Sequence, residues 1–567
     1  MSNFAELYTE EGLNLPEIPW DIYPRPLMKR DSFLCLNGEW EFCVRRGDEY
    51  TETEKIKVPF SPETLLSGVG INLDEEVYDS FVYKKQFSLP EGFNKGRVLL
   101  HFGAVSNYSE IILNEKTIGI HRGAYDSFFF DVTDNLKSEN TLEVYVKNIL
   151  RDNLLPYGKQ SRKRGGMWYT PTSGIWQTVW LESVPNEYIK NIKTEIKDDK
   201  VIIKAESIGD AKVKLNTDDG IFEYNMNNGV CEIALDEPKY WSPETPYLYY
   251  FSVETEKDRV ESYFAFRTLE IKRVDGYERL CLNGKPYFFH GLLDQGYWSD
   301  GGMTPPSPTS YEKDIMAIKS LGFNMLRKHI KIELPQFYYD CDRLGMVVFQ
   351  DMINNGDYSF FRDTALPTIG IKTLNDRCLH KDEAPRDIFA EYMEKTVEIL
   401  GGYPSICCWT IFNEGWGQFC GTEMYKKLKE IDSTRFIDTA SGWFKGVESD
   451  VDSEHIYFRK VKLKARKKPL VLSEFGGYSY RVGGHIFNPD NEYGYGKYKT
   501  REDFAKAFCD LYSNEILPLV RKGLCASVYT QVSDVEDETN GLFTYDRRVL
   551  KVNPNEFASI SERLKKI

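Results

Sequence analysis

Two glutamates in this chain stand where an apolar run ends, and paired carboxylates can do acid and base chemistry. Glu414 lies in "CWTIFNEGWGQ" and Glu474 lies in "PLVLSEFGG". A carboxylate buried without a partner costs roughly several kcal/mol, so such a residue is either paired or used. Two carboxylates in different surroundings can hold different protonation states at one pH, which lets one donate a proton while the other stays ionised.

Each glutamate also has a structural interpretation, as a helix cap or as one half of a surface ion pair. A glycine follows closely after each of them, in "NEGWG" and "SEFGG". We expect these glycines to leave room above the carboxylates for a ligand. The repeated order of apolar run, Glu and Gly therefore favours a functional site.

The part of the chain that must position the two glutamates alternates strands with helices. Beyond Asp275, eight apolar runs predict strands: "YFFHGLLD", "FNMLRKH", "MVVFQDM", "ICCWTIFNE", "RFIDTAS", "SEHIYF", "PLVLSEFG" and "CASVYTQVSD". Amphipathic segments between them predict helices near residues 311–321, 333–344, 386–400, 423–431 and 502–520. This alternation predicts a closed parallel (β/α)8 barrel, the TIM barrel.

Counting strands places Glu414 at the end of the fourth strand and Glu474 at the end of the seventh. In such barrels the carboxyl ends of the strands line the active-site face. We expect the two strands to lie on opposed sides of the barrel, so that the two side chains lean toward each other over its mouth. Carboxyl groups about 5 Å apart would match retaining glycosidases, in which one Glu attacks the anomeric carbon and the other protonates the leaving oxygen.

The first half of the chain predicts two all-β domains. Short alternating strands and Gly, Asn and Asp turns over residues 33–185 are typical of an antiparallel sandwich. Residues 186–272 suit a small immunoglobulin-like sandwich. We therefore predict a multidomain protein of the β and α/β classes, with domains at residues 1–185, 186–272 and 273–567.

Composition limits the partners. The net charge of −15, from 72 basic and 87 acidic residues, argues against a nucleic-acid partner. The eleven cysteines form no Cys/His cluster, so we predict no metal, no disulfide framework and a reducing, cytoplasmic location. No apolar run reaches the length of about eighteen residues that a membrane span needs, so no membrane partner is predicted. Aromatic residues make up 14% of the chain, which suits sugar binding and would permit a homo-oligomer.

Eight motifs occur in one order along nearly the whole chain: "SGIWQTVWLE", "WSPETPYLY", "LCLNGKPYFFHG", "FNMLRKH", "YDCDRLGMVVFQDM", "TIFNEGWGQ", "PLVLSEFGG" and "QVSDVEDETNGLFTYDRR". Together they resemble glycoside hydrolase family 2, which includes β-galactosidases, β-glucuronidases and β-mannosidases. The resemblance implies a jelly-roll sugar-binding domain, an immunoglobulin-like sandwich and a catalytic barrel. It also implies a β-glycoside substrate and no cofactor.

By motif position, the resemblance makes Glu414 the general acid/base and Glu474 the nucleophile. Asn413 would hydrogen-bond the sugar 2-hydroxyl, a contact that strengthens in the transition state. Tyr457, in "HIY", would sit against the nucleophile and hold it ionised. The alternative for Tyr457 is a packing role inside the barrel.

Further candidates lie on neighbouring predicted strands and loops. Arg327 and His329 occupy alternate positions of the second strand and so share a face. Arg327 is either a clamp on Glu474 or its neighbour, or part of a structural ion pair. Candidates for contact with sugar hydroxyls or a ring face are Asp294, Trp298, Asp351 and His455, with loop packing as the alternative for Trp298.

The sequence departs from the family pattern around the sugar pocket. Trp168 stands where β-galactosidases and β-glucuronidases usually carry Asp, Tyr529 replaces a Trp of the eighth strand, and "RKHIKI" replaces Arg-x-Ser-His-Tyr-Pro. Trp168 and Tyr529 are kept as substrate-binding candidates. The Asn-x-Lys pair that meets the sugar carboxylate in β-glucuronidases is not found after "CASVYTQ", and a carboxylate ligand would need such a cation.

These features predict a retaining exo-β-glycosidase that removes a terminal neutral sugar and is β-galactosidase-like. The alternatives are another family 2 specificity (β-glucuronidase, β-mannosidase or arabinosidase), a carbohydrate-binding protein without catalysis, and a transglycosylase. Long loops at residues 297–308 and 353–381 are expected to wall the pocket into an exo-acting shape.

Overall fold

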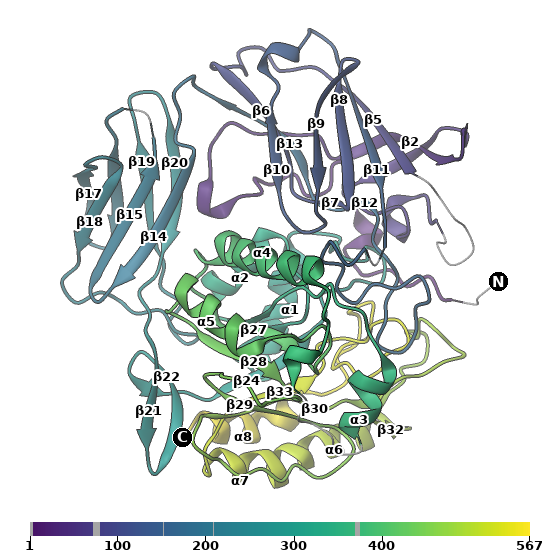
Figure 1. Ribbon diagram of the computed structural model, residues 1–567, viewed down its shortest axis with the longest axis vertical. Helices are drawn as coiled ribbons and strands as arrows, with labels where there is room; N and C mark the ends of the chain where they lie inside the picture. Colours follow the sequence, from purple (N-terminus) through teal and green to yellow (C-terminus); the bar gives the residue numbers. More distant parts are fainter. Residues whose placement is uncertain (1–3, 72–79, 151, 208, 369–374, 567) are drawn as a thin grey trace.

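The computed structural model describes residues 4–71, 80–150, 152–207, 209–368 and 375–566. Two β-sandwiches lie side by side over a barrel of parallel strands and its surrounding helices (Figure 1). The multidomain β and α/β class predicted from the sequence is confirmed.

The first sandwich consists of two antiparallel sheets that face each other. One sheet has the order β1-β13-β6-β10, and the other has the order β3-β2-β5-β11-β8-β9 with β4 against β2. Its strands are β1 (Leu34–Cys35), β2 (Gly38–Arg46), β3 (Glu49–Tyr50), β4 (Glu54–Val58), β5 (Ser80–Phe87), β6 (Arg97–Phe102), β7 (Val105–Ser106), β8 (Tyr108–Leu113), β9 (Lys116–Arg122), β10 (Phe128–Asp131), β11 (Asn140–Lys147), β12 (Gly174–Ile175) and β13 (Val179–Val184). Along β11 every second residue is buried, because successive side chains of a strand point to opposite faces.

The second sandwich is smaller and packs a three-stranded sheet against a four-stranded one. The orders are β14-β15-β18 and β17-β16-β19-β20, and every pairing is antiparallel. The strands are β14 (Asn191–Lys197), β15 (Lys200–Glu206), β16 (Lys212–Thr217), β17 (Gly220–Asn225), β18 (Val230–Ala234), β19 (Tyr249–Glu254) and β20 (Arg259–Phe264). Seven strands in two sheets match the immunoglobulin-like prediction.

The end of this sandwich differs from the prediction. The run "SYFAFRTLEI", which ends inside the predicted 186–272 sandwich, splits into β20 and β21 (Leu269–Val274), and β21 pairs with β22 (Tyr277–Leu282) and not with the sandwich. Asp275 and Gly276 join β21 to β22, both with positive φ (51° and 84°). A two-residue turn of this kind favours a local hairpin, so β21 takes its nearest partner in sequence. A short strand, β23 (Lys285–Pro286), completes this sheet.

The eight predicted barrel strands are present and pair in parallel. They are β24 (Phe289–Asp294), β25 (Met325–Lys328), β26 (Val347–Asp351), β27 (Ile406–Asn413), β28 (Phe436–Ser441), β29 (Asp452–Ile456), β30 (Leu470–Gly476) and β33 (Leu524–Thr530). Their order is β28-β27-β26-β25-β24-β33-β30-β29, and β28 and β29 at its two ends lie next to each other, which nearly closes the barrel. β27, β30 and β33 are buried along their whole length, as expected for parallel strands covered on both faces.

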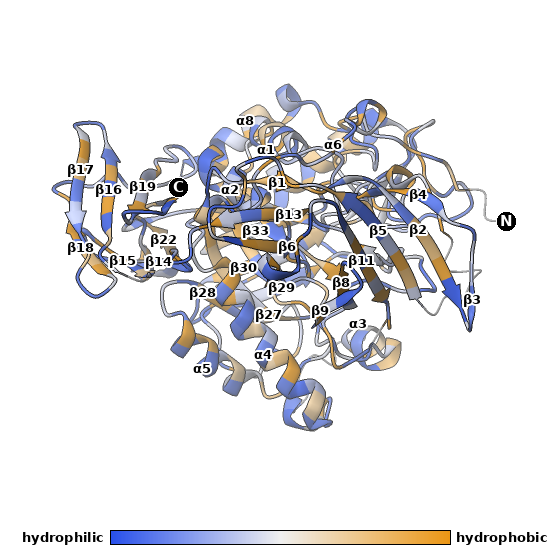
Figure 2. Cartoon of the chain, turned by 90° about the horizontal axis from the view of Figure 1, so that it is seen from above, coloured by the Kyte–Doolittle hydropathy of each residue, from blue (hydrophilic) through white to orange (hydrophobic). Residues whose placement is uncertain are grey.

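Helices cover the outside of the barrel. They are α1 (Thr309–Ser320), α2 (Pro335–Leu344), α3 (Leu366–Thr368), α4 (Glu383–Leu400), α5 (Gly421–Ile431), α6 (Arg501–Leu511), α7 (Leu517–Val520) and α8 (Pro554–Lys565), and a short pair, β31 (Tyr478–Tyr480) and β32 (Gly496–Tyr498), follows β30. Seen from above, α4 and α5 alternate between hydrophobic and hydrophilic residues, as helices with one face on a barrel do (Figure 2). No helix of the described residues is both long and apolar enough to cross a membrane.

Two details of the helices differ from the sequence prediction. The helix expected over residues 502–520 is interrupted by a π-helical turn at Tyr512–Ile516, just before Pro518. Proline lacks the N–H that a regular α-helix needs at that position, so the hydrogen-bond pattern shifts there. The final helix, α8, was not predicted, although Asn553 and Glu556 form a capping box at its start.

A segment of the first sandwich reaches the mouth of the barrel. It is the chain between β11 and β12, residues 148–173. The Tyr157 hydroxyl donates to the backbone oxygen of Gly356 (2.7 Å), and the Tyr169 hydroxyl donates to Glu538 (2.9 Å). We call residues 148–173 the bridging segment, because it is anchored to barrel loops after β26 and β33.

Candidate active site

The two glutamates meet at the carboxyl ends of the barrel strands. Glu414 directly follows β27, with a positive φ of 53° and its N–H bonded to the backbone oxygen of Ser441 (3.0 Å). Glu474 lies in β30 where its register against β33 is irregular, and such bulges redirect a side chain. One carboxylate oxygen of each residue lies within 4.8 Å of the other. Their strands are three positions apart around the barrel and not directly opposite, yet the separation is close to the roughly 5 Å of retaining glycosidases.

Glu474 is buried (4% exposed) and held by two donors. Arg327 Nη1 donates to one carboxylate oxygen at 3.0 Å, and the Tyr457 hydroxyl donates to the other. Burial alone would raise the pKa of Glu474, but His455 and Arg327 outweigh it and lower this pKa to about 2. Burial also raises the pKa of Tyr457 well above its usual value, so the phenol keeps the proton that it donates. Glu474 is therefore an ionised, oriented carboxylate at neutral pH.

Glu414 has a wetter environment. Its side chain is 22% exposed, and one of its oxygens lies 2.8 Å from His455 Nδ1. The other ring nitrogen of His455 lies 3.1 Å from Ser441 Oγ and 3.7 Å from Glu474. His455 thus links the two carboxylates, and the two acids sit in different surroundings, as a pair with different protonation states requires.

Arg327 connects the nucleophile candidate to the rest of the site. Besides Glu474, it donates to both oxygens of Asp351 (2.9 and 3.0 Å) and to the side-chain oxygen of Asn413 (2.9 Å). With that oxygen occupied, the Asn413 amide nitrogen remains as the group that can donate to a ligand. Both interpretations of Arg327 therefore hold, because it clamps Glu474 and belongs to a buried ion pair.

His329 shares the face of Arg327, as the strand alternation predicts. Its Nδ1 lies 2.6 Å from Asp351, while its buried Nε2 has no hydrogen-bond partner among the described residues. Burial and the nearby Lys159 lower the pKa of His329 to about 4, so the ring is neutral at pH 7. With a proton on Nδ1, Nε2 is a free acceptor for a hydroxyl.

The same three side chains could also hold a metal ion, because Glu414, His455 and Glu474 offer donor atoms within 4.8 Å of one another. The neighbours favour proton chemistry instead. Arg327 and Tyr457 already donate to both oxygens of Glu474, and a buried guanidinium repels a second cation at this distance. The expectation of no metal stays a prediction.

A cavity opens at Glu414, and its empty space, together with the solvent at its mouth, amounts to about 330 Å³. The residues that line it are Lys159, Met167, Trp168, Tyr358, Asp363, Asn413, Glu414 and Trp416. We call it the acid cavity. The rings of Trp168 and Trp416 meet edge to face at 5.1 Å, which gives the cavity an apolar wall of the kind that sugar rings contact. Trp168, a substrate-binding candidate on the bridging segment, therefore lines the same cavity as Asn413 and Glu414.

Three candidates lie elsewhere. Asp294 pairs with Lys328 (2.6 Å), and it lines a separate small cavity together with Trp298. Trp298 is 3% exposed and packs under the guanidinium of Arg547, at 4.3 Å from the ring centre. Tyr529 is fully buried, and its ring packs against Phe508 of α6 (5.0 Å between ring centres) on the outside of β33. Among the described residues, no hydrogen bond or ion pair joins these three to the two glutamates. The reason is that the end of a strand can direct a side chain to either face.

The glycines after the glutamates have another role than predicted. A Cβ on Gly415 would lie 2.0 Å from the Phe444 ring, and a Cβ on Gly476 would lie 2.3 Å from the Tyr529 ring. Both glycines also have positive φ (75° and 81°). They permit tight turns and close packing and do not open space for a ligand, so that expectation was wrong.

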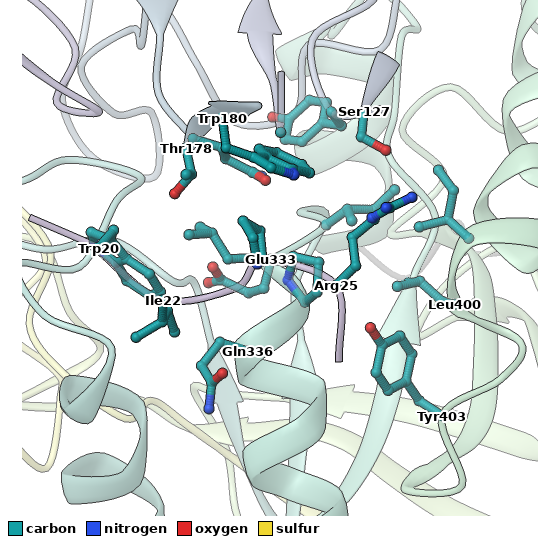
Figure 3. Close-up of a pocket in the computed structure, with 18 residues that line it drawn as sticks. Trp20, Ile22, Arg25, Ser127, Thr178, Trp180, Glu333, Gln336, Leu400 and Tyr403 are labelled. Carbon is teal, nitrogen blue, oxygen red and sulfur yellow. The ribbon is translucent and has the colours of Figure 1, made fainter. Parts of the chain in front are cut away.

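A larger cavity lies away from this chemistry, between the first sandwich and α2, and its empty space, together with the solvent at its mouth, amounts to about 680 Å³ (Figure 3). Trp180 of β13 forms one side and Gln336 of α2 the other (Figure 3). Glu333 is the one carboxylate among its described lining residues, and it is paired with Lys328 and Lys331. Size alone does not locate the active site, since this cavity lacks a second acid.

Sequence reasoning missed Lys159, Tyr358 and Trp416 as residues of the acid cavity. The signal for Lys159 was present in the basic run "KQSRKRGG" at residues 159–166 of an otherwise acidic chain. The loop at residues 353–381 supplies Tyr358 and Asp363, as expected of a wall, although residues 369–374 lie outside the described part. The loop at residues 297–308 contributes to the separate small cavity through Trp298.

Two sandwiches above a parallel barrel that brings two glutamates together define the architecture of a multidomain glycoside hydrolase. Three family models match the chain: "Glycosyl hydrolase 2 galactose-binding domain-like" at residues 60–170, "Glycosyl hydrolases family 2" at residues 182–267, and "Glycosyl hydrolases family 2, TIM barrel domain" at residues 273–553. The chain belongs to glycoside hydrolase family 2.

Known relatives carry more than one substrate name. A β-galactosidase of Thermoanaerobacter pseudethanolicus is 26% identical over 298 residues, which cover 48% of this chain and 39% of that protein. The structure of a β-D-glucuronidase from Dictyoglomus thermophilum has a TM-score of 0.73 at 20% identity, covering 96% of this chain and 99% of that one. A β-galacturonidase from Eisenbergiella tayi, bound to galacturonate, has a TM-score of 0.66 at 18% identity, with coverages of 96% and 99%.

At these identities the structural likeness establishes the fold. The matched part spans between 39% and 48% of the length of the first curated relatives.

Proposed function

We propose that this chain is a retaining exo-β-glycosidase that works by double displacement. The observation that carries the proposal is the separation of at most 4.8 Å between oxygens of Glu414 and Glu474. Retaining chemistry needs carboxyl groups about 5 to 5.5 Å apart, whereas inverting chemistry needs about 6.5 Å or more to fit a water between them. The separation here supports direct attack by a carboxylate on the sugar.

Each residue has a role that follows from its surroundings. Glu474, ionised and held by Arg327 and Tyr457, attacks the anomeric carbon and forms a glycosyl-enzyme ester. Glu414, which is more exposed, gives its proton to the leaving oxygen and then takes a proton from the water that hydrolyses the ester. The Asn413 amide nitrogen is free to donate to the 2-hydroxyl, where a hydrogen bond strengthens in the transition state.

The Glu474→Gln variant tests the proposal. It keeps the size of the side chain and removes the nucleophile, so turnover of aryl β-glycosides should fall on the order of 10³-fold or more. Glu454→Gln is the matched control, because Glu454 lies on β29, next to β30, and its carboxylate accepts from Lys445 in the loop after β28 (2.7 Å) and not from a residue of the acid pair. Full activity in Glu474→Gln would refute the assignment.

A carbohydrate-binding protein without catalysis is the second candidate. It is favoured by the pocket residues that depart from the family pattern, such as Trp168. A 2-fluoro glycoside with a good leaving group separates the two. In an enzyme the fluorosugar mass adds to the peptide that contains Glu474, because deglycosylation is slow. A binder shows no such adduct.

The sugar is the finer question. A neutral, β-galactose-like sugar was predicted because no Asn-x-Lys pair follows the last strand, whereas the relatives include both β-galactosidases and β-glucuronidases. A panel of chromogenic β-galactoside, β-glucoside, β-mannoside, β-glucuronide and β-galacturonide substrates decides it. Hydrolysis over transglycosylation, a cytoplasmic location and a homo-oligomer stay predictions.

A further inference from the structure

One cation in the acid cavity has no role in the proposed chemistry. Lys159 belongs to the bridging segment of the first sandwich and lines the cavity together with Asn413 and Glu414. Its backbone is fixed on both sides. The Tyr169 N–H donates to the Lys159 carbonyl (3.0 Å), and the preceding Gly158 N–H donates to the backbone oxygen of Asn354 (3.2 Å) in the loop after β26. The side chain therefore starts from an ordered position at the barrel mouth.

The Lys159 ammonium is not used within the described part of the chain. It makes no hydrogen bond or ion pair there, whereas Arg164 in the same segment pairs with Glu536 and Asp537. A partly buried lysine that has no acceptor loses part of its hydration and gains no hydrogen bond from the protein in exchange. Its free donors are available to a ligand.

The acids around Lys159 already have other partners. Of the two that line the acid cavity, Glu414 contacts His455 (2.8 Å) and Asp363 accepts from Arg362 (2.6 Å). Deeper in the site, Glu538 accepts from the Tyr169 hydroxyl (2.9 Å) and from the side-chain nitrogen of Gln531 (2.5 Å). Lys159 is near enough to Glu474 and Glu538 to lower the pKa of both, but it binds neither. None of these acids is a direct counterion for it.

Unused polar atoms gather at the same end of the barrel. His329 Nε2, Thr530 Oγ1 and Gln531 Oε1 are buried and have no hydrogen-bond partner among the described residues. They follow β25 or end β33, the strands on either side of β24. Buried polar atoms are normally paired. These three do not line the acid cavity, but they offer hydrogen-bonding groups at the same end of the barrel as the two glutamates.

We propose that Lys159 binds the carboxylate of the substrate, and that the sugar accepted by the acid cavity is a β-linked uronic acid. This inference rests on the proposed function and names its substrate class. The loop after β33 carries acids at Asp534, Glu536, Asp537 and Glu538, which would repel a sugar carboxylate. The cation that a sugar carboxylate needs comes instead from the first sandwich. The neutral-sugar prediction looked for this cation after the last barrel strand and did not consider the first sandwich.

Paired substrates test the inference, each pair differing only in carboxylate against hydroxymethyl at C5. They are the p-nitrophenyl β-glucuronide with the β-glucoside, and the β-galacturonide with the β-galactoside. The wild type should prefer at least one uronide over its neutral counterpart. Lys159→Gln should lower kcat/KM for that uronide by about 10- to 100-fold, the range for a lost hydrogen bond to a charged group, and change the neutral counterpart less than about threefold.

Two further variants separate charge recognition from structural damage. Lys159→Arg keeps the charge and should retain most uronide activity. Lys163→Gln removes an exposed lysine from the same basic run and should leave both activities unchanged. Equal losses on both members of a pair in Lys159→Gln, or no loss on either, would overturn the inference.

A binding experiment keeps the inference testable without turnover. Calorimetry with free D-glucuronate and D-galacturonate, against D-glucose and D-galactose, should show binding of a uronate by the wild type and its loss in Lys159→Gln. If the wild type binds no uronate yet hydrolyses neutral glycosides in a Glu474-dependent way, the proposed function stands and the Lys159 inference falls. If Glu474→Gln stays fully active, the proposed function falls, while uronate binding still reports on Lys159.

Discussion

The hydrogen bond from Tyr457 to Glu474 makes a quantitative prediction about the pH dependence of activity. In Tyr457→Phe the ring remains, stacked on Tyr495 at 4.1 Å, and only the donated proton is lost. A hydrogen bond to a charged group contributes about 1.5–3 kcal/mol, and about 1.4 kcal/mol corresponds to one pKa unit. The pKa of Glu474 should therefore rise from about 2 to roughly 3–4.

The direction of this pKa change predicts the direction in which the pH profile of activity moves. Glu474 must be ionised to attack, so the acid limb of kcat/KM should move up by about one to two pH units in Tyr457→Phe. At pH 7 the carboxylate stays ionised in both proteins, so any loss of rate there reports its orientation. A carboxylate whose pKa is lower in the folded protein than in the unfolded one stabilises the fold at pH values above its unfolded pKa. This stabilisation is lost as the pH falls through the folded pKa. The variant should thus also lose up to about 3 kcal/mol of unfolding free energy at neutral pH.

The assay is kcat/KM on an aryl β-glycoside from pH 2 to 8, with circular dichroism used to define the range in which each protein is folded. The wild-type acid limb should lie at the lower edge of this range, and the limb of Tyr457→Phe should lie inside it. Tyr425→Phe is the matched control, because the Tyr425 hydroxyl donates to Asp450 (2.7 Å) beside α5 and outside the acid cavity. An acid limb that stays where the wild type has it, or that moves equally in the control, would refute the assigned role of Tyr457.

Three more outcomes follow from the structure. Glu414→Ala should lower kcat/KM, which reports formation of the glycosyl-enzyme, in proportion to the basicity of the leaving group, with dinitrophenyl glycosides nearly spared. A uniform loss of kcat/KM would contradict the acid role. Gly415→Ala should lower unfolding free energy by about 1–3 kcal/mol in a denaturant titration, since it strains a positive φ and drives a methyl into Phe444. Burial would raise the pKa of Glu182, but Arg25 and its neighbours hold it well below the usual 4.5. The melting temperature should therefore fall as pH drops below about 4.5, and Glu182→Gln should be less stable at pH 7 and flatter across this range.

Some of the predicted site residues could be recognised from the residues next to them in the sequence, and others could not. Glu414, Glu474 and Asn413 follow long apolar runs, and a buried strand leaves few places where such groups can emerge. Asp294 and Tyr529 also occupy strand ends, yet the structure places Asp294 with Lys328 and Tyr529 against α6. Alternation of polar and apolar residues along a strand shows that neighbouring side chains point to opposite faces. It does not show which of the two faces points toward the active-site end of the barrel.

Irregularities in the backbone decided further contacts. The register of β29 against β30 shifts next to His455, and the register of β30 against β33 shifts around Glu474. These shifts turn His455 between the two acids and bring Tyr457, just beyond β29, onto the nucleophile. No residue pattern in either strand predicts such a bulge, because it depends on the strands packed on both sides.

By itself the sequence determined the order of the domains, the eight barrel strands and the two acids that end the fourth and seventh of them, since hydrophobic periodicity and burial of apolar runs are local properties. Only the tertiary structure decided how far apart those acids lie and which distant groups surround them. Lys159 and Trp168 reach Glu414 across more than 240 positions of chain, from a different domain. Such contacts arise when folded surfaces dock, so they are set by the shape of the whole molecule and not by any stretch of its residues.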